Sequence, residues 1–241
     1  MKILPNRSFK TRDEFIQYFT RGSANLIDKN DLIVSLCKDK KVLDLGCIDH
    51  SFQIAINLGD NWLHKRIKVV ARQVIGIDNL EEDVLQLNKK GYNIINTNVE
   101  NFDLGQKFEV IIAGDIIEHL SNIGMFLNSV KKHMDTNSIL VITTPNPFNL
   151  EQTLSAILNN HINVNDQHTV WLSPHNFWEL CERHQLSILD LFWIDTRFHF
   201  VVNWKGIKLI IINKLINIIM SKRNILKRDF AVIMKIQEDT K

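Results

Sequence analysis

The chain has 241 residues, of which 45% are hydrophobic and 23% are charged, and its formal net charge is only +2. A chain of this length and composition can bury a sizeable core, which argues against disorder as its main state. The small net charge gives no reason to expect a nucleic-acid partner. With only 9 glycines, the sequence has no glycine-rich loop that ends in Lys-Ser or Lys-Thr, which excludes a P-loop nucleotidase.

The cysteines and the apolar runs indicate the compartment. Cys37, Cys47 and Cys181 form an odd set at no metal-ligand spacing, so we expect reduced thiols, with neither a disulfide frame nor a bound metal. The first ten residues lack the apolar stretch of a secretory signal, and no uninterrupted apolar run reaches the roughly 18 residues of a membrane span. The sequence therefore predicts a cytoplasmic protein without a metal site.

Along the chain, the hydrophobic pattern predicts helices first and then an alternation of strands and helices. Two helices, over 11–20 and about 24–37, form an N-terminal helical cap over residues 1–39. From residue 40 onward, short apolar runs typical of buried strands alternate with helical stretches. The expected strands are 42–46, 74–78, 93–97, 108–113, 138–144, 188–194 and 230–236, and the expected helices are 62–72, 81–90, 122–134, 150–158 and 173–184. This alternation predicts an α/β domain over residues 40–241, with a largely parallel sheet covered by helices on both faces.

Between the last two expected strands lies a basic amphipathic insertion, at about 200–228. Residues 205–228 carry an apolar stripe of isoleucines and leucine, surrounded by lysines and arginines. Such a segment can pair with a second copy of the chain as a homodimer, lie on an anionic membrane surface, or only cover the sheet. Peripheral membrane contact is the interpretation that we do not favour.

Chemistry is expected where the parallel strands end, because ligands of such sheets bind beyond the carboxyl ends of the strands. Gly46 follows the first strand and lets the backbone approach a ligand closely. Asp78 ends the second strand, where a carboxylate can accept both hydroxyls of a ribose. These two features alone are also compatible with ordinary turn residues.

Five segments together match one family in their order and spacing, over about residues 40–195. They read VLDLGC at 42–47, VIGID at 74–78, NVE at 98–100, FEVIIAGDIIEHLSN at 108–122 and SILVITTPNPFN at 138–149. They resemble the class I S-adenosylmethionine-dependent methyltransferases, in the branch that methylates small molecules and glycan or quinone precursors. Residues 168–194 are similar to the helix and strand that follow the core of that branch. The resemblance implies a Rossmann-like, seven-stranded, mostly parallel sheet whose last strand is antiparallel.

The resemblance also implies the cofactor and the residues near it. S-adenosyl-L-methionine would bind, with S-adenosyl-L-homocysteine as its product: Asp44 and Gly46 would border the methionine portion, and Asp78 would hold the ribose. The segment 98–100 would line the adenine; the alternative for Asn98 is a turn residue that caps the third strand. The full expected set is Asp44, Gly46, Cys47, His64, Asp78, Asn79, Asn98, Val99, Glu100, Gly114 and Asp115.

The sequence departs from the family in its first loop. That loop normally reads Asp-x-Gly-x-Gly-x-Gly, whereas Ile48 and His50 here take the places of the second and third glycines. Either the loop follows another path or the site has lost its ligand. We expect another path, because the connection from Gly46 to Asp78 is also unusually long.

Two aromatic groups allow either a site or a core interpretation. Trp62 and His64 begin a helix, where they would stack on the cofactor and donate to its carboxylate, or else be a core tryptophan and a solvated histidine. Phe15, Tyr18 and Phe19 of the first helix form either a lid over the cofactor or plain packing against the sheet edge.

Two histidines are candidates for the catalytic base, or for the group that orients the acceptor. His119 follows the fourth strand in a Glu-His pair, and His168 lies in a loop where this fold places its acceptor. The alternatives are a pair that packs a helix against the sheet, for His119, and a surface histidine, for His168.

We therefore expect a methyltransferase that acts on an oxygen, less readily a nitrogen, of a small molecule, such as a sugar in polysaccharide biosynthesis for the cell envelope. The alternative is a catalytically inactive partner subunit that binds S-adenosylmethionine. A nicotinamide-dependent oxidoreductase falls behind both, because its acidic residue comes about 20 residues after the glycine motif. Here Asp78 comes 32 residues after Gly46.

Overall fold

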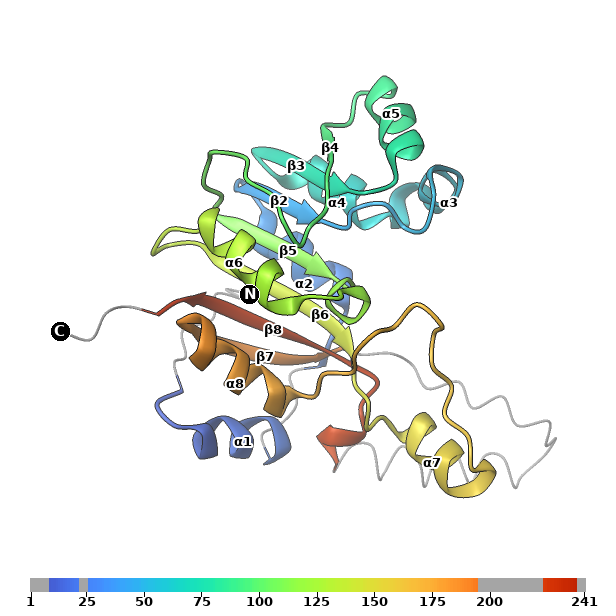
Figure 1. The fold of residues 1–241 in the computed structure, drawn as a ribbon, viewed down its shortest axis with the longest axis vertical. Coiled ribbons are helices and arrows are strands. Elements are labelled where there is room, and N and C mark those ends of the chain that lie inside the picture. The colour runs from blue at the N-terminus through green and yellow to red at the C-terminus, as the bar shows by residue number, and fades with distance from the viewer. Residues whose placement is uncertain (1–8, 22–25, 195–222, 238–241) are drawn as a thin grey trace.

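A sheet of eight strands forms the centre of the fold, in the order β1-β7-β8-β6-β5-β2-β3-β4 (Figure 1). The computed structural model describes residues 9–21, 26–194 and 223–237. Neighbouring strands are parallel except around β8, which runs antiparallel to both β6 and β7. The strands are β1 (Leu26–Ile27), β2 (Lys41–Leu45), β3 (Gln73–Asp78), β4 (Ile94–Asn96), β5 (Val110–Gly114), β6 (Ile139–Pro145), β7 (Leu186–Ile194) and β8 (Asp229–Ile236). The predicted Rossmann-like sheet with an antiparallel last strand is confirmed, and the two-residue β1 extends its seven strands by one.

Helices cover both faces of the sheet. They are α1 (Arg12–Arg21), α2 (Lys29–Cys37), α3 (Phe52–Leu58), α4 (Leu63–Val70), α5 (Glu81–Lys89), α6 (Ile123–Lys132), α7 (Leu150–Asn159) and α8 (Pro174–His184). Helices α1, α6 and α8 pack their apolar side chains against one face, and α2 and α4 pack against the other. Helices α3 and α5 contribute to a smaller core beside β4 (Figure 1).

The first part of the chain differs from the sequence prediction in two places. The second helix begins at Lys29 rather than near residue 24, because Asp28 caps it by accepting the N–H of Asp31, and residues 26–27 join the sheet instead. Helix α3 was not predicted; Ser51 caps it by accepting the N–H of Ile54. Both caps are single polar side chains, which is a weak signal in a sequence without strong apolar periodicity.

The aromatic residues of α1 pack rather than form a lid. Phe15 and Phe19 are fully buried in the main core, and the Tyr18 hydroxyl donates to Asp190 on β7 at 2.7 Å. The described residues thus support the packing interpretation for this helix. Most of the basic insertion at about 200–228 lies outside the described residues, as do the first residues of the N-terminal cap.

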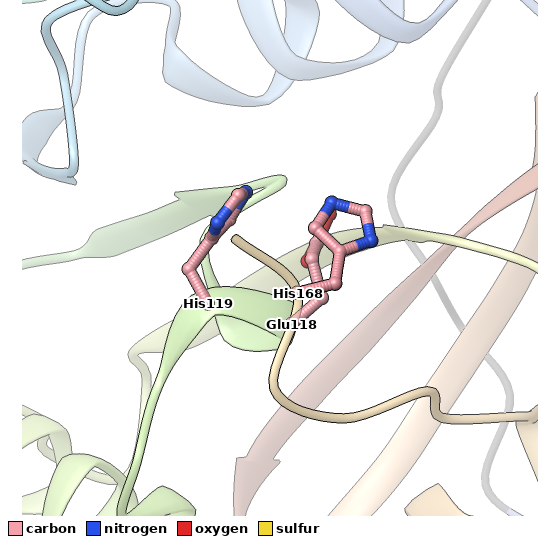
Figure 2. A group of neighbouring side chains, drawn as sticks. All are labelled: Glu118, His119 and His168. Atoms are coloured by element: carbon pink, nitrogen blue, oxygen red, sulfur yellow. The ribbon is translucent and has the colours of Figure 1, made fainter. Parts of the chain in front are cut away.

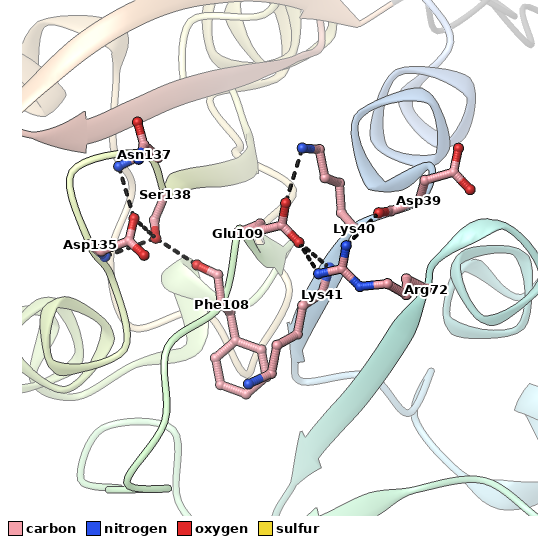
Figure 3. Close-up of polar contacts among 9 residues, drawn as sticks. All are labelled: Asp39, Lys40, Lys41, Arg72, Phe108, Glu109, Asp135, Asn137 and Ser138. Atoms are coloured by element: carbon pink, nitrogen blue, oxygen red, sulfur yellow. Dashed lines mark hydrogen bonds and ion pairs between the residues drawn. The ribbon is translucent and has the colours of Figure 1, made fainter.

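Polar contacts tie together the amino ends of the parallel strands (Figure 3). Glu109, just before β5, accepts the backbone N–H of Lys41 at 2.9 Å and pairs with Lys40 and Arg72. Ser138, just before β6, donates to the carbonyl of Phe108 at 2.6 Å. These polar groups pair with one another and hold the amino ends of the strands together. Binding is therefore expected at the carboxyl edge of the sheet.

The carboxyl edge contains the point at which the strand order reverses. From β2 the chain crosses to β3 and β4 on one side, whereas β5 and β6 lie on the other side of β2. Ligands of open α/β sheets bind beside such a switch point, outside the carboxyl ends of the strands. Gly46, Asp78 and Gly114 all stand at this edge, at the ends of β2, β3 and β5.

Gly46→Ala is expected to destabilise the fold markedly. Gly46 has a φ of +67°, and a Cβ there would stand 2.5 Å from Cδ1 of Ile116. The left-handed conformation costs a non-glycine residue about 1–2 kcal/mol, and displacing the flexible side chain of Ile116 adds to that cost. Urea unfolding measures the sum. Gly105→Ala is the matched control, because its φ is +62° and a Cβ there meets nothing within 4 Å. Equal losses at both positions would contradict the predicted steric contact.

No helix among the described residues is long and apolar enough to cross a membrane.

Candidate active site

The loop after β2 follows a path in which the side chain of Ile48 is buried. The N–H groups of Gly46 and Cys47 donate to the carbonyl of Ile77 at 2.8 and 3.3 Å, which holds the loop against β3. Ile48 and Cys47 are 6% exposed and pack in the small core beside β4. His50 is exposed and adopts a φ of +60°, a conformation that favours glycine. Where the family has glycines at positions 48 and 50, this chain has a loop that the buried side chain of Ile48 anchors.

Asp78 stands at the end of β3 with its carboxylate bound to the backbone. Its oxygens accept the N–H groups of Ile48 at 2.9 Å and Leu80 at 3.2 Å. Burial raises the pKa of Asp78, and these backbone donors oppose the rise. A carboxylate offers about four acceptor positions, so the two bonds leave capacity for further donors such as ribose hydroxyls. Asn79, the next residue, is exposed.

Trp62 and His64 belong to the core. His64 is 1% exposed, its Nδ1 lies 2.8 Å from a carboxylate oxygen of Asp44, and Trp62 donates from its ring to the carbonyl of Cys47 at 2.8 Å. In the part of the chain that the structure describes, Nε2 of His64 has no hydrogen-bond partner. The two side chains thus face each other inside the core, and the expected roles of Asp44 and His64 toward a cofactor stay predictions.

The segment expected to line an adenine makes structural contacts of its own. The side chain of Asn98 accepts the N–H of Glu100 at 2.8 Å, which is the turn-capping alternative. Val99 is 8% exposed and packs in the main core. Glu100 accepts the N–H groups of Ser121 and Asn122 at 2.6 and 2.9 Å and so fixes the entry to α6. Their contact with a cofactor stays a prediction.

A cluster of polar side chains lies at the end of β5, and one of its members, Lys29, was not predicted from the sequence. Gly114 is followed by Asp115, which has a φ of +48° and accepts the hydroxyl of Thr143 at 2.7 Å. The second oxygen of Asp115 pairs with the ammonium group of Lys29, the first residue of α2. Lys29 lies 86 residues away in the sequence, so no local pattern could have placed it here.

Glu118, His119 and His168 gather next to this group (Figure 2). One nitrogen or oxygen atom of each lies within 4.8 Å of those of the other two, and the imidazole rings meet edge to face with centroids 4.7 Å apart. The loop that carries His168 is fixed because the N–H groups of Thr169 and Val170 donate to the carbonyl of Glu118 at 2.8 and 3.3 Å. Two histidines singled out separately in the sequence thus occupy one site.

The charges of this site shift the pKa values of its members. Burial raises the pKa of Glu118 to about 7, and the neighbouring carboxylate of Asp115 adds to the shift. Burial and the adjacent His119 lower the pKa of His168, so its ring is neutral near neutral pH. A neutral imidazole can accept a proton or coordinate an ion.

Asp229→Asn is expected to stabilise the protein near pH 8 by about 1–2 kcal/mol once solvent screening is allowed for. Burial and the charge of Asp115 raise the pKa of Asp229 to about 6, while Lys29 and Arg228 oppose the rise. When the pKa of an acid is higher in the folded than in the unfolded protein, the protein loses stability as the pH rises from the unfolded to the folded pKa. The gain should therefore shrink as the pH falls from 8 to 4, and it vanishes only below the unfolded value of 3.8, where the carboxyl is neutral in both states. Unfolding curves at both pH values test this, with the exposed Asp60→Asn as control; a pH-independent effect would contradict it.

The comparisons with known proteins identify the family. A family model described as "Methyltransferase domain" matches residues 8–191. Among curated relatives, the ubiquinone biosynthesis O-methyltransferase of Rhodopseudomonas palustris (strain HaA2) is 26% identical over 137 residues, covering 54% of this chain and 50% of that protein. The enzyme of the same name from Rickettsia akari (strain Hartford) is 22% identical over 163 residues, covering 63% and 60%. The chain thus spans about half the length of the first curated relatives it matches.

Solved structures agree on the fold. A SAM-dependent methyltransferase from Archaeoglobus fulgidus has a TM-score of 0.53 at 16% identity, covering 86% of this chain and 94% of that one. An S-adenosylmethionine-dependent methyltransferase from Clostridium acetobutylicum has a TM-score of 0.54 at 13% identity, covering 87% and 91%. The chain belongs to the methyltransferase-domain family, with the class I fold, and S-adenosylmethionine is the cofactor of that class.

Proposed function

We propose that this protein transfers a methyl group from S-adenosylmethionine to an oxygen atom of a small molecule. The observation that carries the proposal is the gathering of Glu118, His119 and His168 beside Asp115, at the same sheet edge as Gly46 and Asp78. When bound, the cofactor supplies an electrophilic methyl group on a sulfonium. The protein must then align the acceptor, exclude water and allow the acceptor to lose one proton. Alignment alone can lower the activation barrier by about 7–11 kcal/mol.

The residues at the sheet edge fit the cofactor. Asp78 has acceptor capacity for ribose hydroxyls, and Gly46 leaves the backbone free of a Cβ where β2 ends. We propose that Gly114 and the backbone near Asp115 border the methionine end, with Lys29 available to a carboxylate there. His64 is left out of this set, because it is buried against Asp44.

On the acceptor side, the two histidines orient the reacting hydroxyl and remove its proton. Nδ1 of His119 lies 3.2 Å from the carbonyl of Gln167. Since a carbonyl only accepts, Nδ1 is the donor of this hydrogen bond, and Nε2 is the ring nitrogen left for the acceptor. His168 is half-buried and neutral, which suits a base that works near neutral pH.

Oxygen is favoured over nitrogen as the acceptor atom because the similar curated proteins are named as O-methyltransferases of ubiquinone biosynthesis. These relatives match only part of the chain at low identity, so we also propose a sugar of a cell-envelope glycan as a candidate acceptor. An inactive binding subunit is the second candidate, favoured by Ile48 and His50 in place of glycines.

A label-transfer assay separates these two candidates. The protein is incubated with methyl-labelled S-adenosylmethionine and with fractions of a bacterial small-molecule extract, and label in each fraction is counted. We expect the label in a small molecule, bound through an oxygen atom and not through a nitrogen atom. A chain that binds S-adenosylhomocysteine yet transfers no label would support the inactive subunit instead.

A further inference from the structure

We propose that Glu118, His119 and His168 bind a divalent transition-metal ion whose open coordination positions hold the acceptor oxygen. The metal site itself is independent of the proposed function; only its role toward the acceptor rests on that function. The sequence predicted no metal, because its cysteines have no metal-ligand spacing. The fold creates a different donor set by joining a Glu-His pair after β5 to a histidine 49 residues further along the chain.

The donor set suits such an ion. Two imidazoles and one carboxylate are the ligands of catalytic zinc sites, which keep a further position open, and of iron sites with open positions. Hard ions such as Mg²⁺ prefer oxygen ligands throughout. The proposed ion is therefore Zn²⁺ or a neighbouring first-row ion, and Co²⁺ is a suitable spectroscopic substitute.

The distances are close to those that an ion requires. The three candidate ligand atoms lie within 4.8 Å of one another. Ligand atoms stand about 2.0–2.2 Å from Zn²⁺, so two ligands of one ion are at most about 4 Å apart. Rotation of the side chains would have to bring the ligand atoms closer together, while the Glu118 carbonyl keeps the 168 loop in place through Thr169 and Val170.

Two of the three ligands also have outer partners of the kind that metal ligands need. Nδ1 of His119 bonds to the Gln167 carbonyl, which leaves Nε2 as the candidate ligand atom, and the Thr144 hydroxyl donates to one oxygen of Glu118 at 3.0 Å. Among the described residues, neither ring nitrogen of His168 has a hydrogen-bond partner apart from the ring contact with His119. Such outer bonds fix the orientation of a ligand and its tautomer.

The surrounding charge favours a cation. The carboxylate of Asp115 stands beside the group, and the ammonium group of Lys29 is its counter-charge. Asp115 already binds Lys29 and Thr143, so we do not count it as a ligand. Its charge still lowers the cost of holding a divalent ion at the neighbouring ligands.

The ion would act as a Lewis acid without any change of oxidation state. An acceptor hydroxyl bound to it loses its proton more readily, as metal-bound water does. With the ion bound, the ring nitrogens of His119 and His168 would act as ligands and not as the base, so the proton would pass to solvent. The new C–O bond would form as the C–S bond of the donor breaks, and the sulfonium would become a neutral thioether. Acceptors with two adjacent oxygens would be favoured, because they can occupy two open positions.

Cobalt titration tests the site directly. Protein treated with a chelator is titrated with Co²⁺ while its visible ligand-field absorption is followed, and Zn²⁺ is then added as competitor. Wild-type protein should saturate with a single ion that Zn²⁺ displaces. Thr144→Val, which removes an outer partner, should weaken binding by roughly 10–100-fold, and His168→Ala or His119→Ala should weaken it further.

His161→Ala is the matched control, because His161 is exposed and lies outside the group. It should bind Co²⁺ as the wild type does. The inference is wrong if the wild type gives no saturable absorption, or if the His161 variant loses as much affinity as the His168 variant. S-adenosylhomocysteine is titrated into the same samples: its binding without cobalt binding would refute the metal site and leave the proposed function standing.

Discussion

His168→Ala should reduce methyl transfer by about 10²–10⁴-fold, the usual contribution of a group that handles the proton of the reacting oxygen. The ring of His168 is half-buried beside His119, with no side-chain hydrogen bond among the described residues that its loss would break. The stability of the fold should therefore change little. Turnover is measured with the acceptor identified by label transfer, and S-adenosylhomocysteine affinity is measured alongside it.

The split between these two quantities is the informative result. We expect kcat to fall while the Kd of S-adenosylhomocysteine stays within a few-fold of wild type, because neither histidine is among the residues that we propose to hold the cofactor. His119→Ala should behave in the same way, and the exposed His161→Ala should retain full turnover. Unchanged rates in both the His168 and His119 variants would remove this pair from the mechanism.

His64→Ala should destabilise the fold by about 3–5 kcal/mol, because it leaves a buried carboxylate without its partner. The side chains of His64 and Asp44 are 0% and 5% exposed and lie 2.8 Å apart. The ring also packs against Trp62 and Tyr92, with centroids 5.4 and 5.9 Å away. Urea unfolding of the wild type and the variant measures the loss.

A double-mutant cycle isolates the pair from the packing. Asp44→Asn, His64→Ala and the double variant should show a coupling of about 0.5–3 kcal/mol, since the double variant no longer buries an unpaired charge. Strictly additive losses would mean that packing alone explains the effect of His64. In that case the pair would not be what holds the start of α4 against β2.

The fold could be predicted because three of the parallel strands end at or just before a recognisable polar or glycine residue. Gly46, Asp78 and Gly114 stand at the ends of the runs that marked β2, β3 and β5, and the alternation with helices then required a parallel sheet. The start of α8, where Ser173 and Asn176 form a capping box, could also be predicted from the sequence. Helix α3 was missed because its one local signal is Ser51, within a loop that does not follow the pattern of the family.

The site was only partly predictable, for a reason that differs from residue to residue. His119 and His168 could be proposed one at a time, but their meeting depends on a loop tied to the Glu118 carbonyl. Lys29 reaches Asp115 from a helix of the N-terminal cap, and nothing near it in the sequence indicates this. The contact of His64 with Asp44 could not be predicted, because a histidine at a helix start looks the same in the sequence whether it faces solvent or a buried aspartate.

The scarcity of glycine at the first loop now has a structural account. Ile48 fills the small core with its side chain, and its N–H binds Asp78, so the loop gains an anchor where the family has a glycine. His50 accepts a left-handed conformation while remaining exposed. The loop is thereby held at the end of β3, beside the carboxylate on which cofactor binding would depend.

Calorimetric titration with S-adenosylhomocysteine tests the central claim most directly. Wild-type protein should bind it saturably, and Asp78→Ala should bind at least about 10-fold more weakly, because hydrogen bonds to a charged group contribute about 1.5–3 kcal/mol. Asp78→Asn, which keeps an acceptor for the N–H of Ile48, guards against simple unfolding, and Asp60→Asn is the control with an exposed carboxylate. Folded wild-type protein that binds no S-adenosylhomocysteine, or Asp78 variants that bind it as well as the wild type, would contradict the account.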